Sequence, residues 1–293
     1  MQSSLILSFT ATLILAANSM AVTLKPGDIV VADSQFAVLR IDSVTRKPEV
    51  ISSGGKLVRP FGVAIDRNGD ILVADTGALA IIRINPATGE QTIVSSGGIL
   101  GTPYGIAIDR NGYILAANAS AIIRIDPATG DKTVISKGGL VAPVGIAIAR
   151  NGAIYVADAA PPGKVVRIRP VTGELTAVYA GGNFVSPVGI AVIGHQILVA
   201  DQDAFGGSGG IIAVDAFNGN QTPLASSGDF ATPVSVAVGQ DGRLLVGDPD
   251  AFELFGGVIE VDPTSHIQSE MYRGSGELVN PRGVAIVPAY KQR

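Results

Sequence analysis

Six acid or amide side chains recur in the chain, each at the end of a short apolar segment. They are Asp33, Asp75, Asn118, Asp158, Asp201 and Asp248. Carboxylate oxygens that converge on one point bind a hard divalent cation such as calcium, and the candidates for that role are Asp75, Asp158, Asp201 and Asp248. Asp and Asn also accept hydrogen bonds from the backbone of the turn that follows them. Because a site for one ligand breaks symmetry and this residue recurs at every equivalent position, we favour the structural role.

Two loops that follow these segments have the sequence Asp-Ala-Phe in common and run on to a pair of glycines. One loop contributes Asp203 and Phe205, and the other contributes Asp250, Phe252 and Phe255. Aromatic residues make up only 5% of the chain, so three phenylalanines on two such loops, with the two acids, are candidate ligand-binding residues. The alternative, which we favour, is that these rings pack inward and fix the loops in place.

Nucleophilic catalysis finds no support in the sequence. The chain has no Cys, which excludes thiolate metal sites and a Cys nucleophile. It also has no Gly-x-Ser-x-Gly elbow ahead of a helix, and its two histidines, His195 and His266, fall in or near turns. We therefore expect no catalytic residues and no required cofactor.

The elements that position these residues are repeated six times. A Pro-x-Gly-aliphatic-Ala-aliphatic block recurs every 40 to 48 residues, at 60–65, 103–108, 143–148, 187–192, 233–238 (with Ser235 in place of Gly) and 281–286. Three further apolar segments belong to each repeat: the acid-terminated one, one that carries an arginine in four repeats, and one that runs into a turn of small residues. The arginines are Arg40, Arg83, Arg124 and Arg167. We expect them to pair with carboxylates between repeats or to lie near the rim, rather than to bind an anion.

Four apolar segments per repeat, each bounded by turn residues, predict four β-strands. Asn68-Gly69 and Asn111-Gly112 supply the positive φ that a tight hairpin requires. Strands that are apolar on both sides indicate sheets that are covered on both faces. The sequence therefore predicts an all-β, six-bladed β-propeller over residues 22–293, as one domain with four antiparallel strands per blade. The final block, 281–286, stands alone, so we expect it to join the N-terminal blade and close the ring.

The six blocks, each followed by a turn and a strand of the Ile-Leu-Val-Ala-Asp type, resemble NHL repeats over about residues 22–288. This resemblance implies a six-bladed propeller of the TolB-like and gluconolactonase-like superfamily. It implies little about activity, because propellers host hydrolases, lyases, receptors and scaffolds. The chain has no Trp, unlike WD40, quinoprotein dehydrogenase and streptogramin lyase-like propellers.

Gluconolactonase-like propellers, the related enzymes, hold a divalent metal at the axis with a Glu, an Asn and an Asp. The corresponding positions here are the middle residues of the Pro-x-Gly blocks: Phe61, Tyr104, Val144, Val188, Val234 and Arg282. None is a carboxylate, which counts against a metal at that level of the channel. Phe61, Tyr104 and Arg282 are instead candidate ligand-binding residues, and a metal-dependent lactonase or hydrolase is the alternative function.

The N-terminal residues predict export. An apolar stretch, residues 5–17, precedes Ser19 and Ala21, which stand at the −3 and −1 positions of a signal-peptidase site. A membrane-spanning helix needs about 20 apolar residues, so we expect a cleaved signal peptide, residues 1–21, and no integral membrane anchor. The formal net charge of −4 provides no cationic field for nucleic acid. Together these features predict a secreted or periplasmic module that binds a protein, peptide or glycan.

Overall fold

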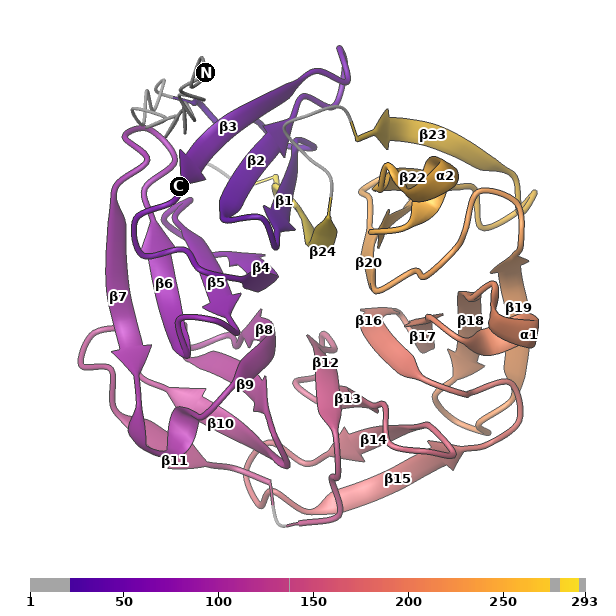
Figure 1. Ribbon diagram of the computed structural model, residues 1–293. Helices are drawn as coiled ribbons and strands as arrows, with labels where there is room; N and C mark the ends of the chain where they lie inside the picture. The colour runs from indigo at the N-terminus through magenta and orange to yellow at the C-terminus, as the bar shows by residue number, and fades with distance from the viewer. Residues whose placement is uncertain (1–21, 137, 275–279, 290–293) are drawn as a thin grey trace, which may run out of the picture.

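The apolar segments of each repeat form four antiparallel strands, and the six resulting sheets stand radially around a central axis (Figure 1). The computed structural model describes residues 22–136, 138–274 and 280–289. The predicted six-bladed propeller is therefore confirmed. The predicted signal peptide, residues 1–21, lies outside the described residues.

In blades 2 to 6 the strands follow chain order from the axis outward. Blade 2 comprises β4 (Pro60–Ile65), β5 (Ile71–Asp75), β6 (Ala80–Ile84) and β7 (Gln91–Ser96); blade 3 comprises β8 (Pro103–Ile108), β9 (Ile114–Asn118), β10 (Ala121–Ile125) and β11 (Lys132–Val134); blade 4 comprises β12 (Pro143–Ile148), β13 (Ile154–Asp158), β14 (Lys164–Ile168) and β15 (Leu175–Ala180). Blade 5 comprises β16 (Pro187–Ile193), β17 (Gln196–Asp201), β18 (Gly210–Asp215) and β19 (Gln221–Ser226); blade 6 comprises β20 (Ser235–Val238), β21 (Leu244–Asp248), β22 (Gly257–Val261) and β23 (Gln268–Arg273).

Blade 1 is assembled from the two ends of the propeller. Its inner strand is β24 (Pro281–Ile286), which is followed outward by β1 (Ile29–Asp33), β2 (Ala37–Ile41) and β3 (Pro48–Ser53). β24 pairs antiparallel with β1, with Ile286 opposite Ile29. The structure thus shows the predicted closure by the C-terminal strand, which leaves no open seam in the ring.

Burial decreases from the second strand of a blade to the fourth. All five residues of β5 are buried, whereas Ser95 is the one buried residue of β7, the outer strand of the same sheet. The second strands lie between neighbouring blades and are covered on both faces, as their apolar sequences predict. The outer strands form the rim, so polar residues such as Gln91 and Thr92 are accommodated there.

A glycine in the Pro-x-Gly block lets the inner strands of neighbouring blades approach each other closely. A Cβ on Gly62 would collide with the backbone carbonyl oxygen of Tyr104 in the next blade, and a Cβ on Gly105 would collide with that of Val144. Only glycine fits where two backbones approach in this way. The block sequence therefore sets the narrow radius of the ring.

Blade 6 lacks the glycine of the Pro-x-Gly block, and a second residue difference in the neighbouring strand compensates for its absence. Ser235 stands where the other blocks have glycine, and Gly247, its partner across β20 and β21, stands where the other blades have alanine. A Cβ on Gly247 would lie 2.5 Å from the Ser235 Oγ. The serine hydroxyl thus fills the space that an alanine methyl group takes in the other blades.

We expect Gly247→Ala to lower the free energy of unfolding by about 1–3 kcal/mol, because it overpacks this contact. Adding Ser235→Gly recreates the glycine–alanine pair of the other blades and should recover most of the loss. Urea denaturation of both single variants and the double variant measures the coupling between the two sites. Losses that simply add would show that the two positions do not compensate for each other.

Candidate functional site

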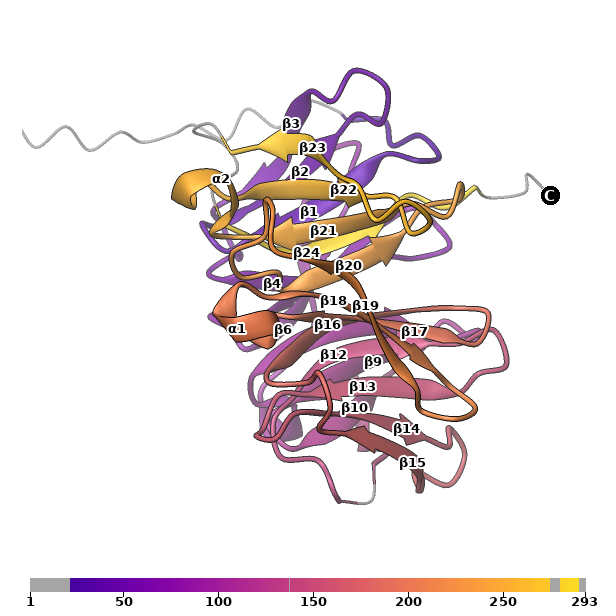
Figure 2. The same cartoon turned by 90° about the vertical axis from the view of Figure 1, so that its right-hand side faces the viewer.

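The connections between strands lie on two faces of the ring. The face that we call the upper face carries the turns between second and third strands (34–36, 76–79, 119–120, 159–163, 202–209 and 249–256) and the approach segments that lead into the inner strands (54–59, 97–102, 138–142, 181–186, 227–234 and 280). The lower face carries the remaining turns. Two single helical turns, α1 (Ala204–Gly207) and α2 (Ala251–Leu254), both lie on the upper face, which is at the left in Figure 2. In the described part of the chain, no helix is long and apolar enough to span a membrane.

The recurring acidic residues form a buried ring beneath the upper face. Both carboxylate oxygens of Asp75 accept hydrogen bonds: Oδ2 from the N–H of Val58, and Oδ1 from the N–H groups of Arg59, Gly77 and Ala78, at 2.8–3.0 Å. The first two donors belong to the approach segment and the last two to the turn that follows the acid. Each carboxylate therefore fastens two connections of its blade to each other.

The same arrangement recurs around the ring. Asp158, Asp201 and Asp248 each accept hydrogen bonds from two successive N–H groups of the approach segment and from one N–H group of the following turn. In blade 1, Asp33 accepts hydrogen bonds from the N–H groups of Gln35 and Asn280. The acid thus has the same structural task in five of the blades.

Asn118 takes the place of the acid in blade 3, and the approach segment there differs accordingly. Its Nδ2 donates a hydrogen bond to the carbonyl of Ile99 at 3.1 Å, within the short 3-10 turn η1 (Gly98–Leu100). A Cβ on Gly101 would lie 2.8 Å from the Asn118 Oδ1, so glycine is needed beside the amide. An amide can donate to a carbonyl group where a carboxylate cannot.

The ring does not fit a divalent cation. The carboxylate oxygens of the candidate ligands Asp75, Asp158, Asp201 and Asp248 already accept backbone N–H groups, and each acid stands in a different blade. Within residues 22–136, 138–274 and 280–289, no three His, Cys, Asp or Glu side chains form a group that could hold a metal. Burial raises the pKa of Asp248 against the lowering effect of its backbone hydrogen bonds. The metal-dependent lactonase alternative therefore gains no support from these acids.

The approach segments that the ring holds present valine side chains to solvent. Val58, Val141 and Val185 each stand two residues before a block proline, and each donates its N–H to the ring carboxylate of its own blade. Their side chains are nevertheless 45%, 64% and 48% exposed. The hydrogen bonds between these backbone N–H groups and the buried carboxylates thus hold the three valines at the surface, close to the start of the inner strands.

Further apolar side chains are exposed on the same face. Together with the three valines, the upper apolar set comprises Phe36, Leu79, Ile99, Leu254 and Phe255. The lower face also exposes large apolar residues: Val44, Val171, Phe217 and Ile267 lie on the turns between third and fourth strands, at the periphery, and Ile193 ends the inner strand of blade 5. Apolar side chains that are gathered on one face mark an interaction surface, whereas scattered ones are normal.

The channel at the axis is narrow. Its walls are formed by the inner strands, with Phe61, Val144, Val188, Val234 and Arg282 among the lining residues, and its volume is about 80 Å³. That volume holds a few water molecules, whereas sites for drug-sized molecules measure about 300–1,000 Å³. This part of the channel therefore admits a group of a few atoms and excludes a whole small-molecule ligand. A second cavity, of about 340 Å³, opens among the lower-face turns and is lined by Arg67, Arg110 and Arg150.

Arg282 stands out among the channel-lining residues because it is charged. Its Nε donates a hydrogen bond to the Asn280 Oδ1 at 2.7 Å. Burial lowers the pKa of Arg282, while the carboxylates of Asp250 and Asp33 oppose that shift. The other two predicted residues of this level, Phe61 and Tyr104, meet edge to face with 5.4 Å between ring centroids.

The aromatic residues of the two long loops are divided between core and surface. Phe252 is buried in the apolar cluster between blades 5 and 6, beneath the guanidinium of Arg273, which lies 4.7 Å from the ring centroid. Phe205 packs against the apolar cluster between blades 4 and 5, and Phe255 is 53% exposed. Inward packing thus describes Phe205 and Phe252, and Phe255 alone of the three belongs to the exposed surface. The sequence signal for this packing is the second glycine of each loop's pair, Gly210 or Gly257, where a Cβ would meet the phenylalanine ring.

The two acids predicted on these loops make contacts within the loops. Asp203 is exposed, and its Oδ2 accepts a hydrogen bond from the Gln202 side chain at 3.2 Å. Asp250 is half-buried, and its Oδ2 accepts a hydrogen bond from the Thr232 hydroxyl at 2.5 Å. Neither contact brings the two acids together.

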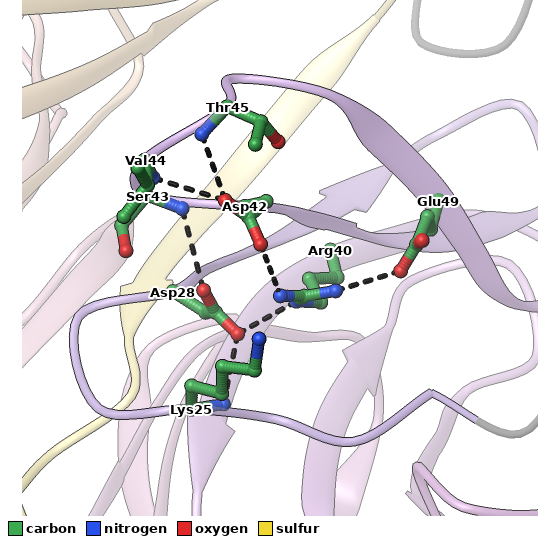
Figure 3. Close-up of polar contacts among 8 residues, drawn as sticks. All are labelled: Lys25, Asp28, Arg40, Asp42, Ser43, Val44, Thr45 and Glu49. Atoms are coloured by element: carbon green, nitrogen blue, oxygen red, sulfur yellow. Dashed lines mark hydrogen bonds and ion pairs between the residues drawn. The ribbon is translucent and has the colours of Figure 1, made fainter.

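Arg40 lies at the centre of a polar network on the lower side of blade 1 (Figure 3). Its guanidinium pairs with Asp28 and Asp42 at 2.6 Å and with Glu49 at 2.7 Å. Hydrogen bonds from the N–H groups of Thr45 and Val44 lower the pKa of Asp42 to about 2. Arg40 thus pairs with carboxylates, as expected for the arginine row, but within its own blade.

Comparison with known proteins finds a similar structure but no similar sequence. No protein-family model matches the chain, and no curated protein matches it. The chain resembles a propeller in the crystal structure of a nidogen/laminin complex, with a TM-score of 0.74 and 19% sequence identity over 88% of this chain and 97% of that chain. At this identity the likeness shows the fold, a six-bladed β-propeller.

Proposed function

We propose that this chain is an exported, NHL-like β-propeller that acts as a protein-binding module through its upper face. The observation that carries the proposal is the exposure of Val58, Val141 and Val185 on approach segments that the buried acids hold rigid. Apolar side chains fixed in this way lose little conformational freedom on binding, which favours association. The channel beside them has a volume of about 80 Å³, which is too small for a drug-sized molecule, and the larger cavity of about 340 Å³ lies among the turns of the lower face.

The structural neighbour is consistent with this role. It is a propeller of the same architecture from a nidogen/laminin complex, which shows that such a fold can take part in protein recognition. Its 19% identity to this chain carries no information about the partner. The partner is therefore defined here by its chemistry, as a protein with an apolar contact surface.

Two matched triple variants test the proposed face. Val58→Ser, Val141→Ser and Val185→Ser remove apolar contacts from the upper face, and Val44→Ser, Val171→Ser and Phe217→Ser remove similar exposed side chains from the lower face. Each immobilised protein is exposed to the extracellular or periplasmic fraction of its source, and retained proteins are quantified by mass spectrometry. We expect one partner to be retained about equally by the unmodified chain and the lower-face variant, and at least about tenfold less by the upper-face variant.

Equal retention by both triple variants would contradict the proposed face. Retention of no protein by the unmodified chain would contradict the proposed function itself. Thermal melting of the two variants serves as the folding control, because exposed valines contribute little to stability.

Export is part of the same proposal. It is supported by the apolar stretch at residues 5–17 and by the small residues Ser19 and Ala21. Val22, the first residue after that site, is buried, and its N–H donates to the carbonyl of Pro86 at 3.2 Å. N-terminal sequencing of the secreted or periplasmic protein should begin at Val22, and recovery of the uncleaved chain from the cytosol would contradict export.

A further inference from the structure

Arg282 is the one charged residue among the six middle residues of the Pro-x-Gly blocks. It lines the channel beside Phe61, Val144 and Val188. A guanidinium carries five N–H donors in a fixed plane, and the described structure gives this one a single side-chain acceptor, the Asn280 Oδ1 at 2.7 Å. The Nη donors of Arg282 have no carboxylate partner among the described residues.

The surroundings of Arg282 explain why this arrangement is unfavourable in the free protein. A cation that is partly removed from water without a paired anion is destabilised, in agreement with the lowering of the pKa of Arg282 by burial. Arg59, on the neighbouring approach segment, adds repulsion. The described carboxylates that act on Arg282 are engaged elsewhere: Asp33 and Asp248 accept backbone N–H groups, and Asp250 accepts the Thr232 hydroxyl.

The shape of the site limits what can pair with this cation. A channel volume of about 80 Å³ admits a carboxylate group but not a complete ligand. The nearby carboxylates of Asp33, Asp248 and Asp250 repel a multiply charged anion such as phosphate more strongly than a singly charged carboxylate. A planar carboxylate matches the two parallel N–H groups of a guanidinium.

We propose that the upper mouth of the channel receives one aspartate or glutamate side chain of the protein partner, which pairs with the Nη atoms of Arg282. Apolar residues that flank this acid in the partner contact Val58, Val141 and Val185. This inference rests on the proposed function, because it assumes that the partner binds the upper face. It adds to that proposal an acidic side chain of the partner, which we call the acidic anchor, and Arg282 as the residue that binds it.

A library of random dodecapeptides displayed on phage supplies a defined probe. Selection on the unmodified mature protein should enrich peptides in which one acidic residue lies between apolar residues. The affinity of the best synthetic peptide should fall at least about tenfold for Arg282→Gln. Arg110→Gln, which removes an exposed arginine from the lower face, should leave the affinity unchanged.

A double-mutant cycle ties the loss to the pair. The peptide with its acid changed to the amide should bind the unmodified protein at least about tenfold more weakly, and Arg282→Gln should weaken that peptide no further. The melting temperature of Arg282→Gln should stay the same or rise, because the substitution removes a half-buried cation that has no carboxylate partner in the described part of the chain. If Arg282→Gln melts at a lower temperature, Arg282→Lys serves as the second variant. Recovery of peptide binding in Arg282→Lys would then show that binding requires a positive charge at this position.

The outcomes separate this inference from the proposed function. Peptides that lose affinity in the upper-face triple variant but not in Arg282→Gln overturn the acidic anchor and leave the upper face as the binding surface. Peptides that bind equally to all variants contradict both. Selection of peptides without enrichment of acids, or of no peptide, also overturns the acidic anchor.

Discussion

Asp75→Ala is expected to lower the free energy of unfolding by about 4 kcal/mol. The Asp75 side chain is fully buried and accepts hydrogen bonds from four backbone N–H groups, those of Val58, Arg59, Gly77 and Ala78. Alanine leaves these donors without an acceptor, and each unpaired buried donor costs about 1–3 kcal/mol before water enters. Because two of them belong to the approach segment and two to the turn, both connections of blade 2 should loosen. Urea denaturation measures the change.

Two further variants define the cause. Asp75→Asn keeps one acceptor oxygen but turns an N–H donor towards other donors, so it should cost about half as much as alanine. Asp229→Ala removes an exposed carboxylate and should change the free energy of unfolding by less than about 0.5 kcal/mol. A loss below about 1 kcal/mol for Asp75→Ala would contradict the structural role. Stabilisation of the unmodified protein by calcium that disappears in Asp75→Ala would restore the metal alternative.

Arg40→Met should lower the free energy of unfolding by about 3–4 kcal/mol. The substitution leaves the Asp28 carboxylate, whose side chain is 1% exposed, without the guanidinium that lies 2.6 Å away. Asp28 also accepts hydrogen bonds from the N–H groups of Lys25 and Ser43 (Figure 3). Its charge is therefore held in place by the backbone and cannot turn towards solvent once its partner is gone.

Because the arginine recurs at the equivalent position of other blades, the chain itself offers a matched control for Arg40→Met. Arg83→Met changes the equivalent residue of blade 2, where the side chain is 30% exposed and the nearest carboxylate, of Asp70, lies 3.7 Å away. It should cost less than about 1 kcal/mol. Arg40→Lys keeps the charge but loses the fork, so an intermediate loss is expected. Equal losses for Arg40→Met and Arg83→Met would show that burial of the ion pair does not decide the effect.

The sequence predicts the strands well because their limits are local. The block at residues 103–108 is both a predicted strand and the observed β8, since apolar residues between turn residues leave little freedom in placing its ends. The six-fold repetition then predicts the number of blades, and the solitary final block predicts their closure. Each of these inferences depends on residues that are close together in the chain.

The contacts that define the upper face depend on pairings across the repeat. A capping role for Asp75 towards the following turn is visible in the sequence, but its bonds to Val58 and Arg59 join residues separated by 17 and 16 positions. The inward position of Phe252 depends on the space above Gly257. That Arg282 has no carboxylate partner among the described residues likewise emerges only once the neighbouring acids are seen to be engaged.

The most direct test of the central claim is a hydroxyl-radical footprint of the propeller, alone and in complex with the protein that it captures. If the upper face binds the partner, the complex should protect Val58, Val141 and Val185 from oxidation, while Val44, Val171 and Phe217 on the lower face should react as in the free protein. Protection of the lower-face residues without protection of the three valines would contradict the account.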